Sequence, residues 1–160
     1  MDMEIIAVEV KKHEKFLRKP APLFDFKKIR PAEIKKIVQD MRLAMKNANG
    51  VGLSANQVGL NLNLFVAELN GKFYALLNPK IVKSSMDTEF LEEGCLSVPG
   101  LYGIVERPSK VTVEGYDLRG KKIKMKAWGF LARVFQHEID HLSGKLFIDS
   151  AKDIRKASSK

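Results

Sequence analysis

The sequence is poor in cysteine, with Cys95 as the only one among its 160 residues. An intrachain disulfide is therefore excluded, which suits a reducing compartment and makes a chemical role for this thiol worth testing. No apolar run approaches the roughly 20 residues of a membrane-spanning helix, and the acidic first residues, M-D-M-E, show no signal-peptide pattern. These absences favour a cytoplasmic protein, with an organelle matrix as the alternative.

Acidic residues are fewer than basic ones, 19 against 28, which gives a formal net charge of +9. A basic surface favours acidic partners such as RNA or an anionic membrane. The lysines are spread along the chain, however, and no aromatic residues interleave with them as stacking platforms. A solvated lysine-rich surface is therefore the main interpretation, and a weak attraction to ribosomal RNA is the alternative. We expect no specific nucleic-acid partner and no membrane partner.

Length and composition indicate a single α+β domain over residues 1–160, with a monomer as the expected state. Hydrophobic residues make up 45% of the chain and charged residues 29%, as is typical of globular proteins. The breakers Pro20 and Pro22 predict an irregular N-terminal segment over residues 1–30. The polar residues 151–160 predict a disordered tail.

Two helices and several short strands are expected between these ends. Pro31 suits the first position of a helix, and apolar residues at helical spacing extend it to about residue 48. Short strand-like runs follow from 62 to 125, and Asn70-Gly71 predicts a tight hairpin turn. Gly129 opens a second helix, with Gly144 as its stop. The predicted fold is therefore mixed or antiparallel short sheets around a central helix, plus an N-terminal helix.

The central helix carries the sequence H-E-I-D-H at residues 137–141. Residues four apart lie on one helix face, so the imidazoles of His137 and His141 can reach one metal ion. Glu138 then lies beside that metal and can take a proton from a bound water. H-E-x-x-H also occurs by chance, so the prediction of a metal-binding helix depends on a third ligand elsewhere.

Cys95, within the sequence E-G-C-L-S, is the candidate third ligand. One thiolate and two imidazoles leave the fourth position of a tetrahedral metal open, which a catalytic site requires. On its own Cys95 fits an inert buried side chain, but beside H-E-x-x-H, with His13 as the only other histidine, the ligand interpretation gains. Glu93 is expected to be structural and paired with an arginine, and His13 to be solvated.

A third candidate segment, G-V-G-L-S-A-N-Q, occupies residues 50–57. Its glycines allow close approach of backbone to a ligand, and Gln57 offers an amide donor for a developing oxyanion. A phosphate-binding loop is rejected, because the Lys-Ser/Thr pair is missing and the glycines follow a helix.

These three segments, in this order, resemble the signature motifs of the peptide deformylase family. The resemblance covers the chain from about residue 34 to residue 148. It implies a hydrolase that removes the formyl group from N-terminal formyl-methionine of nascent peptides and releases formate. It also implies one divalent metal ion, with Fe²⁺ as the native ion and Zn²⁺, Ni²⁺ or Co²⁺ as substitutes, whereas ligand softness by itself favours zinc.

The resemblance implies a role for each residue that matches the motifs. Cys95, His137 and His141 would be the metal ligands, and Glu138 would be the general base and acid. Gln57 and the backbone N–H of Leu96 would stabilise the oxyanion. The residues expected to bind the peptide, which would dock like an added strand, are Gly50, Val51, Gly52, Leu91, Gly94, Arg107, Phe130 and Val134.

The sequence departs from the family at three places. The N-terminus lacks the apolar-Pro-Asp entry that many members carry near their first strand, and H-E-K-F-L-R-K-P at residues 13–20 takes its place. Ser54 stands where the motif usually has Ala, and the long C-terminal helix that is associated with ribosome docking in some members is not recognisable. Two roles stay open for Asp140, which either orients a ligand histidine or is structural. Trp128 is expected in the core or at the rim of a pocket.

Two alternatives of a different class are considered. The first is an H-E-x-x-H peptidase, in which a third histidine or a downstream glutamate is the ligand and Cys95 is dispensable. The second is a non-enzymatic basic domain that associates with ribosomes and keeps a vestigial site. Retention of every catalytic side chain argues against the second, because a vestigial site is free to lose Glu138 or Gln57.

Overall fold

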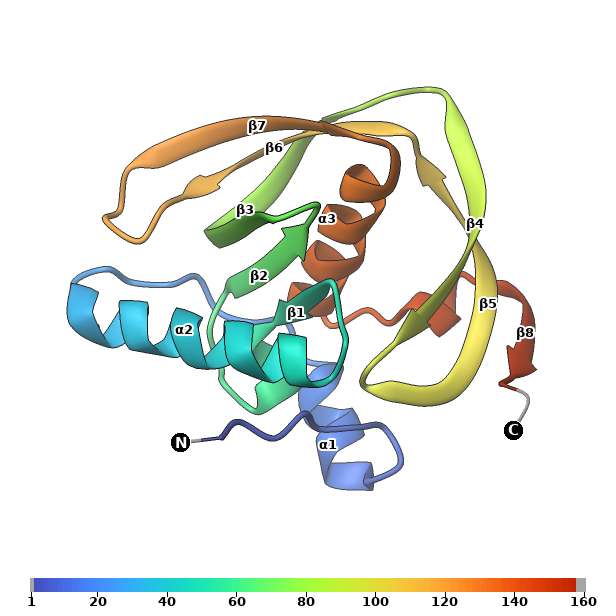
Figure 1. Ribbon diagram of the computed structural model, residues 1–160, viewed down its shortest axis with the longest axis horizontal. Helices are drawn as coiled ribbons and strands as arrows, with labels where there is room; N and C mark the ends of the chain where they lie inside the picture. The colour runs from blue at the N-terminus through green and yellow to red at the C-terminus, as the bar shows by residue number, and fades with distance from the viewer. Residues whose placement is uncertain (1, 158–160) are drawn as a thin grey trace.

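A computed structural model describes residues 2–157 as three α-helices and two antiparallel sheets (Figure 1). The helices are α1 (Lys11–Leu17), α2 (Pro31–Asn47) and α3 (Gly129–Leu142). The strands are β1 (Gly52–Ser54), β2 (Leu64–Leu69), β3 (Lys72–Ser84), β4 (Thr88–Cys95), β5 (Val98–Pro108), β6 (Lys110–Tyr116), β7 (Lys122–Trp128) and β8 (Lys152–Lys156). Short 3₁₀ helices occupy η1 (Ala55–Val58) and η2 (Phe147–Asp149). The predicted α+β class is confirmed.

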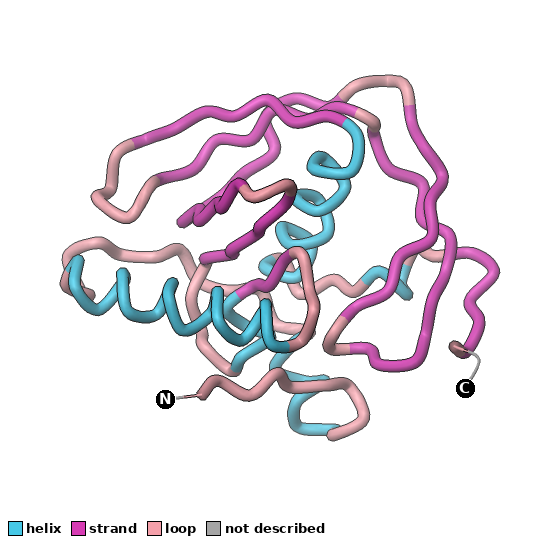
Figure 2. Tube along the Cα trace, viewed as in Figure 1, coloured by secondary structure: helices cyan, strands magenta, loops and turns pink. Residues whose placement is uncertain are grey.

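The larger sheet has the strand order β1-β2-β3-β6-β7, and the smaller has the order β4-β5-β8. Helix α3 lies at the centre, with strands above it and to its right in Figure 2. Alternate residues of β2 explain this layering. Phe65 and Ala67 pack with α3, whereas Leu64 and Val66 pack with α2 on the opposite face. The prediction of sheets around a central helix is therefore confirmed.

The helix and the hairpin predicted from local pattern are present. Helix α2 begins at Pro31 and buries Ile34, Val38 and Met41. The turn between β2 and β3 consists of Asn70 and Gly71, both with positive φ, as a type I′ turn requires. Within residues 2–157, no helix is long and apolar enough to cross a membrane.

The predictions for both ends of the chain are wrong in part. The N-terminal segment contains α1, whose Leu17 is fully buried and whose neighbour Arg18 forms an ion pair with Asp149, 2.6 Å apart. The C-terminal segment contains β8, which pairs with β5. All residues of β8 are exposed, so their polar composition concealed a strand that backbone hydrogen bonds hold in place. Residues 158–160 lie outside the described residues.

Candidate metal centre

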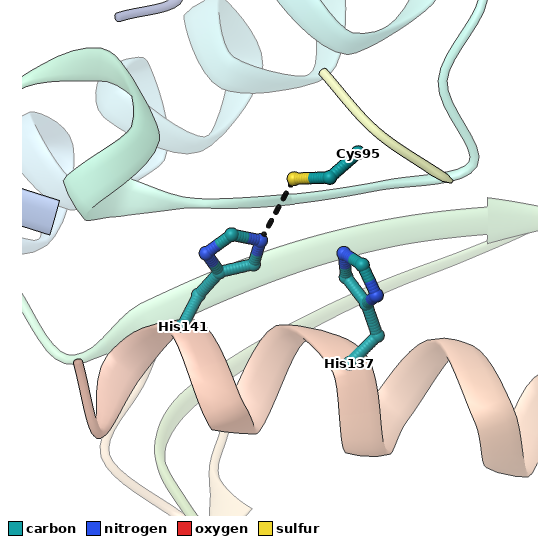
Figure 3. A group of neighbouring side chains, drawn as sticks. All are labelled: Cys95, His137 and His141. Atoms are coloured by element: carbon teal, nitrogen blue, oxygen red, sulfur yellow. Dashed lines mark hydrogen bonds between the residues drawn. The ribbon is translucent and has the colours of Figure 1, made fainter. Parts of the chain in front are cut away.

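Helix α3 brings the two imidazoles of the H-E-x-x-H sequence to the end of strand β4. His137 and His141 project from one face of the helix toward Cys95 (Figure 3). Their ligand atoms and the Cys95 sulfur all lie within 4.8 Å of one another, and Cys95 Sγ is 3.2 Å from His141 Nε2. The three residues predicted to share a metal are therefore brought together.

The donor set of this cluster fits a metal ion. Nδ1 of His137 contacts Glu93 Oε1 at 2.8 Å, which leaves Nε2 of the same ring free for a metal. Burial holds the pKa of His141 well below its usual value, which favours the neutral ring that a metal ligand requires. Two imidazoles and one thiolate are ligands typical of zinc and similar borderline ions, and they leave one coordination position open.

Glu93 is the hub of a buried ionic cluster behind His137. Arg107 donates to it through Nε at 2.6 Å and Nη2 at 2.9 Å, and Arg133 donates through Nη1 at 2.6 Å. Burial opposes ionisation of Glu93, but hydrogen bonds from His137 and Arg107 outweigh it and lower the pKa of this carboxyl group to about 2. The predicted pairing with an arginine is confirmed, and the anion orients the His137 ring.

Arg133 is the member of this cluster that sequence reasoning missed. It is 4% exposed and also donates to the carbonyl oxygens of Val105 and Glu89, at 2.9 and 2.8 Å. It therefore ties α3 to β5 and β4. One feature of the sequence could have indicated its role. Arg133 is a charged residue one helical turn before His137, within an otherwise apolar stretch of the helix.

Asp140 is connected to His137 only through other side chains. Its Oδ2 accepts from Arg107 Nη1 at 2.8 Å, and Arg107 in turn contacts Glu93. Direct orientation of His137 comes from Glu93, and Asp140 holds the far end of the arginine.

Gln57 lies in η1 with its amide group held in one orientation. Its Oε1 accepts hydrogen bonds from the backbone N–H and the hydroxyl group of Ser54, both at 3.0 Å. Its Nε2 donates to Ser97 Oγ at 3.1 Å and faces Cys95 Sγ at 3.6 Å. Ser54, the departure from the family motif, is fully buried, and its hydroxyl group adds one constraint on the amide donor.

Glu138 is 3% exposed, and its Oε2 is buried with no hydrogen-bond partner among the described residues. Burial raises the pKa of this carboxyl group to about 7, against the opposing charges of His137 and Arg107. Gly52 lies against it: a Cβ at that position would be 2.7 Å from Glu138 Oε1. Glycine is therefore required at position 52 for the carboxylate to lie in its present place.

A cavity of about 510 Å³ opens beside the cluster. The predicted site residues that line it are Gly50, Val51, Gly52, Gln57, Gly94, Cys95, Leu96, Phe130, Val134, His137 and Glu138. His141, Leu91 and Arg107 are not in the lining. Leu91 lies on β4 with 43% of its surface exposed, and Arg107 is 6% exposed with its guanidinium group held by Glu93 and Asp140.

Comparison with known proteins shows which family this chain resembles. The profile of the polypeptide deformylase family matches residues 7–157. The chain belongs to the peptide deformylase family. A peptide deformylase of Pelotomaculum thermopropionicum is 46% identical over 121 residues, which are 76% of this chain and 77% of that protein. One of Desulforudis audaxviator is 45% identical over 133 residues, 82% of this chain and 86% of the relative.

Solved structures of peptide deformylases have the same fold. The crystal structure of the Thermotoga maritima protein is similar with a TM-score of 0.86 at 34% identity, covering 95% of this chain and 99% of that one. The Synechococcus elongatus protein, crystallised with actinonin, gives a TM-score of 0.85 at 38% identity, covering 94% and 79%. The chain is thus a metal-dependent hydrolase that removes N-formyl groups from nascent peptides. Membership of this family decides against the peptidase and non-enzymatic alternatives.

Replacing Arg107 by Met is expected to destabilise the fold strongly, because Glu93 and Asp140 lose a buried partner. Removing one member of a buried ion pair typically costs about 3–5 kcal/mol. Urea denaturation measures the free energy of unfolding. Arg155→Met is the matched control, because Arg155 also makes a forked contact with a glutamate, Glu92, but the two side chains are 56% and 42% exposed. A loss of only about 0–1 kcal/mol is expected there, and equal losses in both variants would contradict the prediction.

Proposed function

We propose that Cys95, His137 and His141 hold the divalent metal ion of this hydrolase. The observation that carries the proposal is the convergence of three ligand atoms within 4.8 Å, from two elements far apart in the chain. When bound, the ion supplies Lewis-acid chemistry, which makes a hydroxide available near neutral pH. The orientation of His137 by Glu93 supports the same assignment.

Glu138 is the proton carrier in this proposal. It follows the ligand His137 on the same helix, lines the cavity, and has one carboxylate oxygen without a protein partner. Its pKa of about 7, raised by burial, suits a group that both takes up and releases a proton near neutral pH. It receives a proton from the attacking water and passes it to the departing amine.

Gln57 and the backbone N–H of Leu96 stabilise the negative charge on the formyl oxygen. Because Ser54 occupies Oε1 of Gln57, the amide presents its Nε2 donor toward Cys95. Leu96 follows Cys95 and lines the same cavity. A donor aligned in advance with a developing oxyanion costs no reorganisation during the reaction.

The peptide docks as an additional strand. Strand β4 is at the edge of its sheet, so its outer backbone groups can pair with an extended chain. Gly94 on this strand and Gly50, Val51 and Gly52 across the cavity flank the peptide, while Phe130 and Val134 receive the methionine side chain. A tight site that admits the small formyl group and excludes larger acyl groups favours deformylation over general peptide hydrolysis.

Leu91 and Arg107 do not line the cavity, and the proposal gives them different roles. Leu91 lies on β4, three residues before Gly94, and its exposed side chain is proposed to contact the methionine residue of the peptide. Arg107 is a positioning residue, because its contacts are with Glu93 and Asp140 and not with the cavity.

Fe²⁺ is the proposed native metal ion, with Zn²⁺, Ni²⁺ or Co²⁺ able to replace it. The iron form is expected to lose activity in air, because iron or the thiolate of Cys95 oxidises. Formate release is measured during aerobic incubation of protein loaded anaerobically with iron, and the nickel form, kept under the same conditions, is the control. Full activity of the iron form after long aerobic incubation would contradict this prediction.

The proposed setting is a compartment in which translation starts with formyl-methionine, the cytoplasm or an organelle matrix. The protein acts there as a monomer with a weak association with the ribosome. The net charge of +9 supports an attraction to ribosomal RNA.

Metal analysis combined with a formate-release assay on a formyl-Met peptide tests the proposed function. We expect one metal ion per chain and one formate released for each formyl-Met peptide that is hydrolysed. An acetyl-Met peptide of the same sequence is the control substrate and should release little acetate. Fully metallated protein that releases no formate would contradict the proposal.

A further inference from the structure

The outer face of β3, β6 and β7 carries a cluster of exposed lysines. The inner face of these strands packs against α3 through residues such as Ile81, Val113 and Met125. Their sequence neighbours point to the opposite side. Figure 1 shows β6 and β7 at the top of the molecule, away from α2, which covers the outer face of the same sheet at β1 and β2.

Strand register gathers six lysines on this outer face. Lys80 lies opposite Glu114, which lies opposite Lys124, and Lys83 lies opposite Thr112, which lies opposite Lys126. Lys110, the first residue of β6, lies opposite Trp128, the last residue of β7. We call this surface the lysine face; its residues are Lys80, Lys83, Lys110, Lys122, Lys124, Lys126 and Trp128, all exposed.

The positive charge of the lysine face is almost uncompensated. Glu114 is the single carboxylate in these rows, and it lies 3.5 Å from Lys122 Nζ. In residues 2–157 the other five lysines form no ion pair. Strand β6 lies between β3 and β7, so the lysines of one row start about 10 Å apart, and successive lysines along β7 start about 7 Å apart. The ammonium groups therefore form a two-sided array around Glu114 and Thr112. Such an array attracts a polymer of phosphates and releases its counterions.

Trp128 adds a stacking surface at one end of the array. It is 69% exposed, and it does not line the catalytic cavity, so the expectation of a core or pocket-rim position is wrong. A flat aromatic ring beside Lys110 offers a base-stacking platform. Membrane binding would require an apolar face to enter the bilayer interface, whereas the other residues of these rows are lysines, Glu114 and Thr112.

We propose that the lysine face binds RNA without sequence specificity, with phosphates on the lysines and a base stacked on Trp128. The proposal rests on the ribosome association proposed above and gives that association a surface. It is independent of the catalytic centre, because none of these residues contacts the metal ligands or lines the cavity.

Trp128 is the only tryptophan of the chain, so its fluorescence reports directly on this surface. Titration with a 20-mer oligouridine is expected to quench the emission, because stacking couples the indole to the base. Fluorescence anisotropy of a labelled 20-mer gives the affinity. With five unpaired lysines, the slope of log K against log salt is expected to be about −3.5.

Two triple variants with equal charge separate the lysine face from general basicity. Lys122→Glu, Lys124→Glu and Lys126→Glu together are expected to weaken RNA binding more than tenfold. The control replaces the exposed Lys11, Lys12 and Lys35 by Glu, and its affinity should fall less than threefold. Each triple variant lowers the formal net charge from +9 by 6. Formate release should be unchanged in both, so a failure of this proposal is distinguishable from a failure of the proposed function.

Trp128→Ala provides a second measurement that does not depend on charge reversal. It is expected to weaken binding of the single-stranded 20-mer about fivefold or more while leaving duplex RNA unchanged. Equal losses of affinity in the two triple variants, or no quenching of Trp128 by RNA, would overturn the proposal. A blue shift of the emission with anionic phospholipid vesicles, without binding to RNA, would overturn it in favour of a membrane.

Discussion

Glu138→Gln is expected to lower formate release by about 10²- to 10⁴-fold at full metal content, the usual contribution of a general acid and base. The amide preserves the size of the side chain, so contact with Gly52 is kept. It is uncharged and cannot carry a proton from water to the departing amine. Because none of the ligand atoms of the metal cluster is changed, metal content should remain at one ion per chain.

Asp140→Asn is the matched control for this substitution. Asp140 lies two residues further along α3, contacts Arg107 and does not line the cavity. Its replacement should change formate release only a few-fold. The test requires steady-state rates and metal analysis of both variants. If Glu138→Gln kept more than a tenth of the activity, the assignment of Glu138 as proton carrier would be wrong. The deformylase activity itself would not be in question.

Cys95→Ala is expected to lower metal affinity by more than about 100-fold and to abolish formate release with it. Loss of groups that merely orient metal ligands costs about 10- to 100-fold in affinity, and Cys95 supplies the ligand atom itself in the proposed site. The two remaining imidazoles hold a divalent ion poorly. Competition with a chromogenic chelator measures the affinity, and added metal in large excess should restore part of the activity.

His13→Ala is the control that addresses the rival ligand set. His13 is the third histidine of the chain and lies on α1, and among the described residues the only cluster able to hold a metal is Cys95, His137 and His141. Metal content and activity should survive its loss. Cys95→Ala with intact metal and activity would show instead that another residue, as in an H-E-x-x-H peptidase, is the third ligand.

Features that depend on neighbours in the chain were predictable. The spacing of His137 and His141 places them on one face of a helix wherever that helix lies, and α3 has the expected bounds. Asn70-Gly71 specifies its turn by backbone preference alone. Strands β1 and β8, in contrast, were not predicted, because a glycine and charged residues hide their pattern, and pairing with β2 and β5 stabilises them.

Contacts between distant segments were beyond prediction from residue pattern. Nothing in the sequence near Arg133 indicates that it shares Glu93 with Arg107, which depends on how α3 packs across β4 and β5. Arg107 was expected near the peptide, yet the same packing turns it toward Glu93 and Asp140. The contact of Gly52 with Glu138 likewise joins β1 to α3.

The sequence by itself determined the chemistry of this protein, because the thiol, the imidazoles, the carboxylate and the amide stand in recognisable local patterns. Only the tertiary structure decided what surrounds them. Cys95 and His141 are 46 residues apart in the sequence and 3.2 Å apart in space. Lysines that look scattered along the chain form rows on one sheet face, because strand register and not sequence distance places side chains opposite each other.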